Sequence, residues 1–367
     1  MSIIIFIIVI VALIVVHEFG HFVAAKLSGM RVDEFGLGYP PRAMTIAKVG
    51  ETVYTLNWLP FGGFVKILGE DDSRPSETDP RAFPSRPRIL QAFVLIAGIA
   101  MNMFFAYVLI TGALAIGTPR ALSQDEIPNA RAAQLIVANV LPGSPAARAG
   151  LSAGDVIISA EDGHFVFSGV DPAAFTEFVA NGGGNATIAL SVRHAGNEEK
   201  TIFIRPETGV IAADPSRSAL GVEVAPVGVV PLSFGSALVE GARLTWGVTT
   251  LTAVGLWHFF SGVFTFSADL SQVAGPVGIA GVVGTASVQG LGYLFSIMAI
   301  ISINLALINL IPVPALDGGR LLFVIIESII RRPIKAGVAR TLNAVGFVFL
   351  VLLMVVVTAH DIFRIVG

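Results

Sequence analysis

The chain has 367 residues, of which 54% are hydrophobic and only 13% are charged, and its formal net charge at pH 7 is −3. With a mean hydropathy of +0.79, this composition is typical of an integral membrane protein and gives no reason to expect a nucleic-acid partner. The chain has no cysteine, which excludes thiolates as nucleophiles or metal ligands. Any bound metal must therefore be held by His, Asp, Glu or water.

The first apolar segment, about 3–25, carries a His-Glu-Phe-Gly-His motif at 17–21. Positions i and i+4 of an α-helix lie on the same face, so His17 and His21 can bind one zinc ion, and Glu18 can act as general base on a water at that metal. The segment is long enough to cross a bilayer, which takes about 20 residues, and ionisable side chains inside a membrane helix are usually functional. A signal peptide, the alternative, would have a basic start and a small-residue cleavage site.

The stretch between the first two apolar segments, 26–88, is polar and rich in Gly and Pro, and nine Lys and Arg lie in it. Alternating residues predict two strands, 52–56 and 64–68, that pair across a turn at 60–63 in a hairpin loop of about 45–69. One alternative is an ordinary cytoplasmic hairpin. The other is a membrane-associated β-hairpin near the zinc, because non-helical backbone persists at membrane depth only where it is buried in protein or beside water.

A second apolar segment, about 89–117, predicts another transmembrane helix and ends the first half of a membrane core, 1–117. It contains small or polar residues that suit contact between helices: Gly98, Ala100, Asn102 and Ala106. Asn102 is expected to form a hydrogen bond between helices rather than to belong to the site.

Charged residues return at 120–225, where twelve acidic residues outnumber seven Lys and Arg. Strand-like runs alternate there with turns and short helices, and 143–157 combines a turn, a short helix and the start of a strand. This pattern resembles a PDZ domain of the kind found in bacterial envelope proteases; the alternative is a small α+β domain without a ligand. The resemblance implies an inserted, extracytoplasmic PDZ domain that binds a peptide C-terminus by strand addition.

The following region, 226–290, is expected to form a membrane-surface helix and a linker. Its apolar part, 234–266, contains Glu240 and Arg243, so it is either another span or a helix lying on the membrane surface. The segment 275–280 is rich in Gly and Pro and is interpreted as linker.

Residues 291–367 are expected to form the second half of the membrane core, with a third transmembrane helix from about 291 and a fourth at about 341–360. Asn309 lies in the third helix, and the prolines and glycines after it should kink or open that helix: Pro312, Pro314, Gly318 and Gly319. Asn309 and Asp317 are then polar groups in a membrane segment, which indicates a functional site. The alternative for Asp317 is a turn aspartate.

The distribution of Lys and Arg predicts the orientation in the membrane. The basic loops 26–88 and 320–340 face the cytoplasm, and 120–225 and both termini face outside. A fifth span at 234–266 would put the basic loop 320–340 outside, so 234–266 is interpreted as surface-bound. With four spans, the motif at 17–21 and Asp317 fall at a similar depth toward the cytoplasmic side. Two histidines, a carboxylate and a water then complete the open tetrahedral site of a zinc hydrolase.

These residues together resemble the site-2 protease family of intramembrane zinc metalloproteases, in its bacterial regulator-of-sigma-E form. The likeness covers the motif at 17–21, Gly62-Gly63-Phe64-Val65, the PDZ-like unit, Gly275-Pro276 and the Asn309-to-Gly319 pattern. The resemblance implies that His17, His21 and Asp317 bind one zinc ion and that Glu18 is the catalytic base. It also implies that the substrate is bound as an added strand at the hairpin and near Asn309, by these residues: Gly63, Phe64, Val65, Asn309, Pro312 and Pro314.

The sequence departs from this family at two points. The best-known enterobacterial members have two tandem PDZ units and this chain has one, which leaves the control of substrate entry open. Arg320 stands where a histidine often follows the Leu-Asp-Gly-Gly sequence, and it is not an expected ligand.

The predicted fold is a polytopic α-helical membrane protein of four transmembrane helices with a membrane-associated β-hairpin and an inserted α+β PDZ domain. The predicted function is cleavage of a pre-shortened single-span membrane protein, such as an anti-sigma factor, in the bacterial inner membrane. The expected partners are that substrate, a peptide C-terminus at the PDZ domain and the lipid bilayer. The alternatives are a non-catalytic membrane scaffold that binds peptides through the PDZ domain, and a zinc-dependent transporter.

Overall fold

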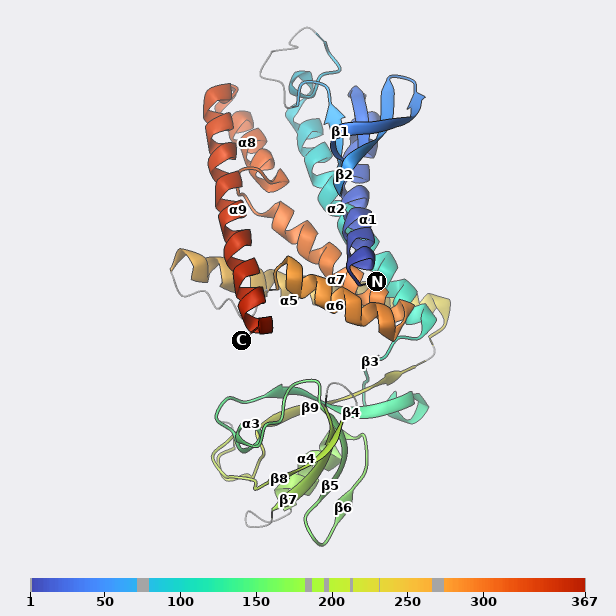
Figure 1. The fold of residues 1–367 in the computed structure, drawn as a ribbon, viewed down its shortest axis with the longest axis vertical. Coiled ribbons are helices and arrows are strands. Elements are labelled where there is room, and N and C mark those ends of the chain that lie inside the picture. Colours follow the sequence, from blue (N-terminus) through green and yellow to red (C-terminus); the bar gives the residue numbers. More distant parts are fainter. Residues whose placement is uncertain are drawn as a thin grey trace. The chain divides into compact units, whose positions relative to one another are not determined.

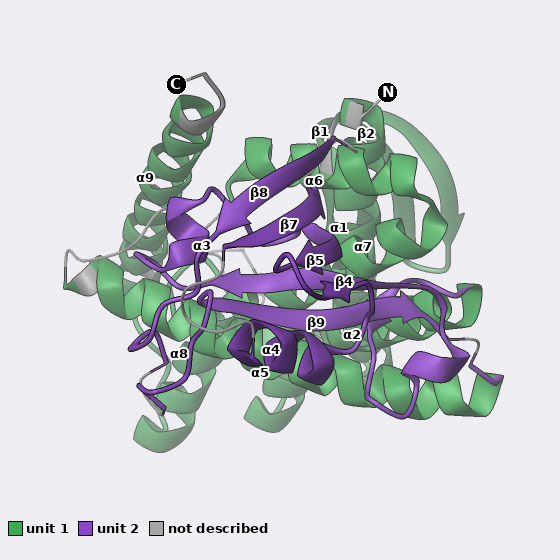
Figure 2. Cartoon of the chain, turned by 90° about the horizontal axis from the view of Figure 1, so that it is seen from below, with its two compact units in different colours: residues 1–116, 234–367 green, residues 117–233 purple. Residues whose placement is uncertain are grey.

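The computed structural model describes residues 2–70, 79–181, 187–194, 198–211, 214–230, 232–265 and 274–366. The chain forms two compact units (Figure 2). Unit 1 comprises Met1–Ile116 and Phe234–Gly367, and unit 2 comprises Gly117–Ser233. Unit 2 is thus an insertion between two halves of unit 1, and each unit is described by itself.

Four helices of unit 1 are long and apolar enough to cross a membrane, among the residues that the structure describes. They are α1 (Ser2–Leu27), α2 (Arg88–Ile116), α7 (Leu291–Leu310) and α9 (Ala336–Val366). Apolar residues cover all sides of α1, as is typical of a helix surrounded by lipid and by other apolar helices. The number and order of the predicted apolar helices are therefore confirmed, and the protein is a membrane protein.

The loop between α1 and α2 forms a two-stranded sheet of β1 (Val32–Val49) and β2 (Thr52–Ile67). The predicted pairing of 52–56 with 64–68 is wrong, because both segments belong to β2 and both pair with β1. Phe35 of β1 lies opposite Tyr54 and also opposite Val65. The first half of β1 therefore lies between the two halves of β2. That half of β1 contains Asp, Glu and Gly, which are rare in strands and conceal it in the sequence.

Two further helices, α5 (Phe234–Phe264) and α6 (Pro276–Gln289), run across the direction of α2 and α9 (Figure 1). The hydroxyl of Tyr107 in α2 donates a hydrogen bond to the Leu238 carbonyl of α5 at 3.3 Å. The prediction of a linker at 275–280 is wrong, because these residues form the N-cap and the start of α6. Pro276 occupies the first turn of that helix, where the missing N–H of proline has no partner to lose.

The helix before α9 is α8 (Asp317–Ile330), which follows α7 after six residues without regular structure. The expected interruption of the third apolar segment is therefore present between Leu310 and Asp317.

Unit 2 is a mixed α+β unit with a sheet in the order β3-β9-β4-β5-β7-β8 and with β6 paired to β5. Its hydrophobic core includes Leu135, Val137, Ile188 and Leu190, none of which is exposed to solvent. The helices and strands of the unit are β3 (Arg120–Ala121), β4 (Arg131–Val140), α3 (Pro145–Arg148), β5 (Val156–Glu161), β6 (Val166–Phe167), α4 (Pro172–Asn181), β7 (Ile188–Arg193), β8 (Glu199–Ile204) and β9 (Val222–Val229).

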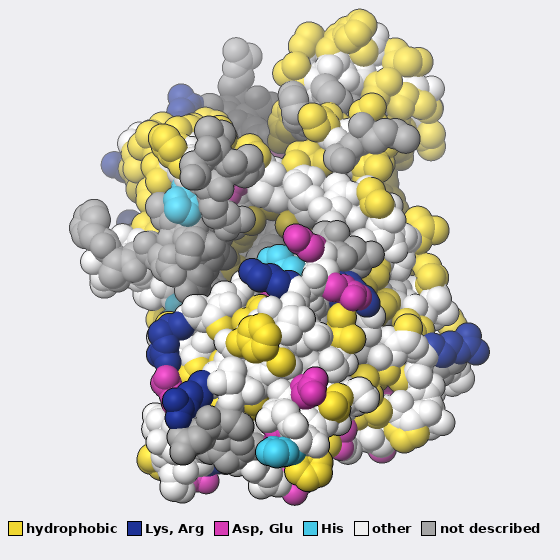
Figure 3. Space-filling view, turned by 60° about the horizontal axis from the view of Figure 1, so that its bottom comes forward, with side chains coloured by type: hydrophobic (Ala, Val, Ile, Leu, Met, Phe, Trp, Pro, Cys, Tyr) yellow, Lys and Arg dark blue, Asp and Glu magenta, His cyan; other side chains and the backbone are white. Residues whose placement is uncertain are grey.

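One boundary of unit 2 differs from the prediction, and the surface of the unit agrees with its composition. The residues 226–229, expected in the linker after the inserted domain, are the end of β9 and pair with β4. Charged side chains of both signs lie on the visible face of this unit (Figure 3), in agreement with its composition and in contrast to the apolar helices of unit 1.

Candidate metal centre

Three side chains that are far apart in the sequence meet in unit 1. His17 and His21 lie one turn apart in α1, and Asp317 is the first residue of α8. The Nε2 atoms of His17 and His21 are 3.2 Å apart. Asp317 Oδ2 lies 3.0 Å from the first of these nitrogens and 3.2 Å from the second. This is the one group of three or more metal-binding side chains found within the described part of the chain.

The donor set fits zinc in geometry and in chemistry. A tetrahedral site with metal bonds of about 2.0–2.2 Å has ligand atoms about 3.3–3.6 Å apart, within a few tenths of an ångström of the three distances here. Both histidines are buried, and two imidazole nitrogens and a carboxylate oxygen gather around one point. A cation at that point satisfies all three, and two His with one carboxylate leave a fourth position open.

Glu18 lies beside the three side chains but makes a different contact. Its Oε2 accepts a hydrogen bond from the backbone N–H of Val65 in β2 at 3.1 Å. A Cβ added at Gly63 would lie 3.8 Å from Glu18 Cγ and 3.0 Å from the Gly36 carbonyl oxygen. The tight distance is the one to Gly36, so the absence of a side chain at Gly63 lets this part of β2 approach β1, while its distance to Glu18 of α1 is an ordinary van der Waals contact. The Val65 N–H is directed at Glu18 and not at β1, and the segment 63–67 pairs with β1 on its other side only, among the described residues.

Helix α2 forms a second wall of the centre. His21 Nδ1 lies 2.8 Å from the Val94 carbonyl oxygen, and His17 Nδ1 lies 3.2 Å from the Asn102 side-chain amide. A Cβ at Gly98 would lie 2.3 Å from His21 Nε2 and 2.9 Å from His17 Cε1, so the site requires glycine there. Asn102 does bond between helices, as predicted, but its partner is a candidate ligand. The spacing of Gly98 and Asn102, one helical turn, is the signal that could have revealed this face.

The interruption between α7 and α8 positions Asp317. Ala315 has a φ of +80°, and its N–H donates to Asn343 Oδ1 of α9 at 3.3 Å. A Cβ at Gly318 would lie 2.4 Å from the carbonyl oxygens of Leu310 and Ile311. The two helices can therefore approach this closely only with glycine at 318, and the result is that the first residue of α8 faces α1.

The remaining predicted site residues occupy the same two segments. Asn309 lies in the last turn of α7, Pro312 and Pro314 lie in the irregular stretch, and all three are at least partly exposed. Phe64 and Val65 are half-buried in β2, next to the buried Gly63. The role of these residues in binding a substrate stays a prediction.

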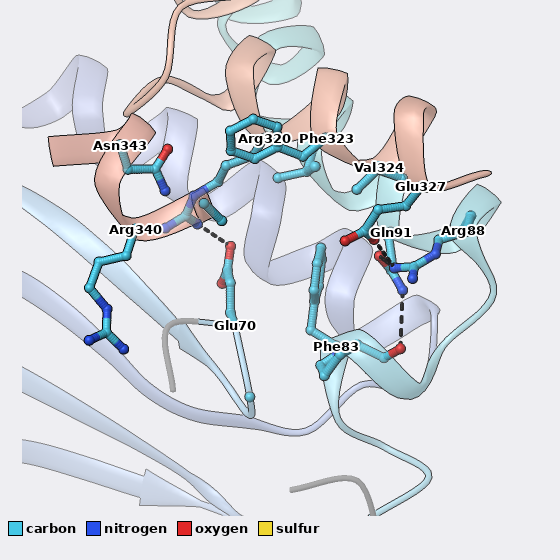
Figure 4. Close-up of a pocket in the computed structure, with 14 residues that line it drawn as sticks. Glu70, Phe83, Arg88, Gln91, Arg320, Phe323, Val324, Glu327, Arg340 and Asn343 are labelled. Atoms are coloured by element: carbon cyan, nitrogen blue, oxygen red, sulfur yellow. Dashed lines mark hydrogen bonds and ion pairs between the residues drawn. The ribbon is translucent and has the colours of Figure 1, made fainter. Parts of the chain in front are cut away.

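A cavity of about 340 Å³, lined by both polar and apolar side chains, lies between the segment after β2, α2, α8 and α9 (Figure 4). Arg320 of α8 pairs with Glu70, and Arg88 of α2 pairs with Glu327 of α8 at 2.7 Å. The residue at the position where the family often has histidine thus joins α8 to the segment that follows β2. These ion pairs hold the helix that carries Asp317 against two of its neighbours.

Comparisons with known proteins identify the family. Residues 5–353 match the model of Peptidase family M50. The chain is 36% identical over 351 residues to a Clostridium perfringens protein named as a candidate zinc metalloprotease, which covers 96% of this chain and 95% of that protein. It is 32% identical over 330 residues to the chloroplastic membrane metalloprotease ARASP of Arabidopsis thaliana, with 88% and 69% covered. The chain therefore belongs to peptidase family M50, the site-2 protease family of metalloproteases.

Proposed function

We propose that this protein is an intramembrane zinc metalloprotease that hydrolyses a peptide bond within or near the transmembrane segment of a single-span membrane protein. The observation that supports this most directly is the meeting of His17, His21 and Asp317 beside Glu18. The motif at 17–21 lies in a helix that is long and apolar enough to cross a membrane. A metal centre in such a helix acts on bonds that a soluble protease does not reach.

His17, His21 and Asp317 would hold one zinc ion. When bound, zinc supplies a Lewis acid and lowers the pKa of a water at its open position to about 7. Glu18 takes a proton from the attacking water and later donates it to the leaving amine. The Val65 N–H bond holds the Glu18 carboxylate at the side of the centre that the β2 edge borders.

The substrate must lose its helical structure before it is cut, because a helix keeps its scissile carbonyl groups in hydrogen bonds. The open edge at 63–67 offers replacement hydrogen bonds to an extended segment. A strand added there would run beside Glu18. The same extended segment would also contact residues in and after the last turn of α7, which precede Asp317 in the chain: Asn309, Pro312 and Pro314.

The exposed apolar side chains of the β1–β2 sheet support its association with the membrane. Several large apolar side chains of the two strands are exposed, and so much exposed apolar surface is rare on a soluble protein: Tyr39, Met44, Ile46, Trp58 and Leu59. Unsatisfied strand edges are unfavourable in lipid, so an added substrate strand would also satisfy the backbone groups of this sheet.

Helix α5 is proposed to lie on the membrane surface. Trp246 and Trp257 are 72% and 74% exposed, and tryptophan is enriched at the boundary between lipid and water. Glu240 and Arg243 lie near the start of the same helix. This placement agrees with the orientation that the basic loops favour, in which the active site is toward the cytoplasmic side of a bacterial inner membrane and unit 2 and both termini are outside.

Unit 2 is proposed to be a PDZ domain that restricts access to the centre or binds the C-terminus of a shortened substrate. Its separate core, its sheet with open edges and its two short helices support this proposal. Ser144 caps α3 by accepting the N–H of Ala147, in the turn that carries the resemblance. The substrate class proposed is a single-span membrane protein already cut on its outer side, such as an anti-sigma factor.

The decisive experiment measures zinc content and cleavage on the same purified protein. The full chain in detergent or liposomes is mixed with a single-span substrate that lacks its outer domain. Stoichiometric zinc and cleavage inside the span, both abolished by chelation, are expected. A scaffold would bind the peptide without cleaving it. A transporter would move zinc across liposomes without cleavage, so either result would contradict the proposal.

A further inference from the structure

The side chain of Asn102 reaches the metal centre from α2, although the proposed chemistry does not use it. The residue has no exposed surface. Its side-chain amide lies 3.2 Å from His17 Nδ1, and its Oδ1 has no hydrogen-bond partner among the described residues. Its backbone carbonyl separately accepts a hydrogen bond from Ser302 Oγ of α7 at 2.8 Å. The side chain and the main chain of Asn102 therefore have different partners.

The chemistry of histidine decides which end of this amide faces His17. A neutral imidazole carries one N–H, so a histidine that offers the Nε2 lone pair to a metal keeps its proton on Nδ1. His21 meets this requirement, since its Nδ1 lies 2.8 Å from the Val94 carbonyl oxygen. At His17 Nδ1 the corresponding group is the amide of Asn102. An amide NH₂ cannot accept this proton, whereas the amide oxygen can.

We infer that Asn102 is a positioning residue whose side-chain oxygen accepts the Nδ1–H of His17 and so directs the Nε2 lone pair at the metal. The inference rests on the zinc site of the proposed function. The nitrogen and oxygen of an amide exchange places by a half-turn of the group. In the orientation that the structure has, the amide oxygen is without a partner among the described residues, and the tautomer of His17 selects the orientation with oxygen toward the ring.

The two histidines thus receive the same support in two different ways. The partner of His21 Nδ1 is a backbone carbonyl, which no substitution removes. The partner of His17 Nδ1 is the side chain of Asn102, and the effect of removing it can be measured. Removal of such an outer partner typically weakens metal affinity about 10- to 100-fold. The effect here is expected to be near the upper end, because both His17 and Asn102 are buried and water does not readily replace the lost acceptor.

The test compares Asn102→Leu with Asn102→Asp and with the control Ser302→Ala in the full-length protein. Leucine branches at Cγ as asparagine does and is larger, but it has no acceptor. Aspartate keeps an acceptor and makes the ring a stronger ligand. Ser302→Ala removes the hydrogen bond to the Asn102 main chain and leaves its side chain in place. Zinc dissociation constants are measured by competition with a chelator, cobalt absorption spectra report the coordination geometry, and the melting temperature reports the fold.

We expect Asn102→Leu to bind zinc about 10- to 100-fold more weakly and to change the cobalt spectrum. Asn102→Asp should bind zinc more tightly than the wild type, and Ser302→Ala should bind it equally well. Wild-type zinc affinity and cobalt spectrum in Asn102→Leu would overturn the positioning role. If Asn102→Leu does not fold, unchanged or weaker zinc binding by Asn102→Asp would overturn it. A wild-type protein without zinc would instead refute the proposed metal centre itself.

Discussion

Two carboxylates lie beside the histidine pair, and their contacts differ. Asp317 Oδ2 is within 3.2 Å of both Nε2 atoms, so it is placed to bind the same metal ion as the two histidines. Glu18 Oε2 is bonded to a backbone N–H of the neighbouring sheet. Substitutions at these two positions should therefore separate metal binding from proton transfer.

Glu18→Gln is expected to abolish proteolysis while zinc content and fold are kept. The amide retains an oxygen that can accept the Val65 N–H, but it cannot take a proton from water. Loss of a general base typically lowers the rate about 100- to 10,000-fold. The measurement is cleavage of the shortened substrate together with zinc content of the purified variant. Substantial cleavage by the pure variant would remove Glu18 from this role.

Asp317→Ala is expected to lower zinc content as well as activity, because two histidines alone hold the ion weakly. Zinc is quantified after dialysis against a chelator of known affinity. Asp361→Ala provides a matched control. Asp361 is also a buried carboxylate of unit 1, but it accepts the Gly278 N–H of α6 and should not alter zinc content. Lost activity at wild-type zinc affinity in Asp317→Ala would assign Asp317 to the substrate instead.

At the scale of elements, β2 combines an inner segment with an edge segment. Val53 lies opposite both Glu34 and Lys48, so it is flanked on two sides by β1. Val65 lies opposite Phe35 on one side and directs its N–H to Glu18 on the other. Backbone groups available to a substrate are therefore expected at 63–67 and not at the inner segment.

Val65→Pro is expected to reduce cleavage strongly at unchanged zinc content, whereas Val65→Ala should have a much smaller effect. Proline removes the N–H that Glu18 accepts and cannot join a ladder of strands, whereas alanine keeps this N–H, so the dependence on the substrate separates strand addition from the loss of the Glu18 contact. The effect should lessen for substrates with Gly or Pro near the scissile bond, because such helices unwind more easily. Equal rates for the proline and alanine variants on a strongly helical substrate would show that strand addition does not occur here.

At the scale of the whole molecule, unit 2 has its own core. The residues that form the metal centre and its surroundings belong to α1, α2 and α8 of unit 1. The expected domain limits, 120–225, would cut β9 in the middle. The limits of the compact unit, Gly117–Ser233, are therefore the better guide for a deletion.

Replacement of 118–232 by a flexible Gly-Ser linker is expected to leave cleavage of a shortened substrate near the wild-type rate. The same deletion should permit cleavage of the full-length substrate, because the proposed size filter is removed. Rates for both substrates and zinc content are measured on the folded variant. A deletion variant that retains zinc and fold but cleaves neither substrate would contradict a gating role and indicate that unit 2 takes part in catalysis.

The sequence by itself determined the features that depend on neighbouring residues. Four apolar runs of membrane length predicted four apolar helices, and the spacing of His17 and His21 placed both on one helix face. The start of α6 was missed because Gly275 and Pro276 resemble a turn, although proline is equally suited to the first turn of a helix. Such local patterns report chain conformation and leave the partners of a segment undetermined.

Only the tertiary structure decided which distant segments meet. The pairing of β1 with both halves of β2 was missed because strand partners are selected by packing across the sheet, and Asp33, Glu34 and Gly36 weaken the local strand pattern. Asp317 was expected near the histidines from membrane depth and family resemblance. Its 3.0 and 3.2 Å distances to the two Nε2 atoms, however, depend on close approaches at Gly318. The contact of Asn102 with His17 depends likewise on how α2 packs against α1, because side chains 85 positions apart are brought together by packing of the whole fold and not by any periodicity of the chain.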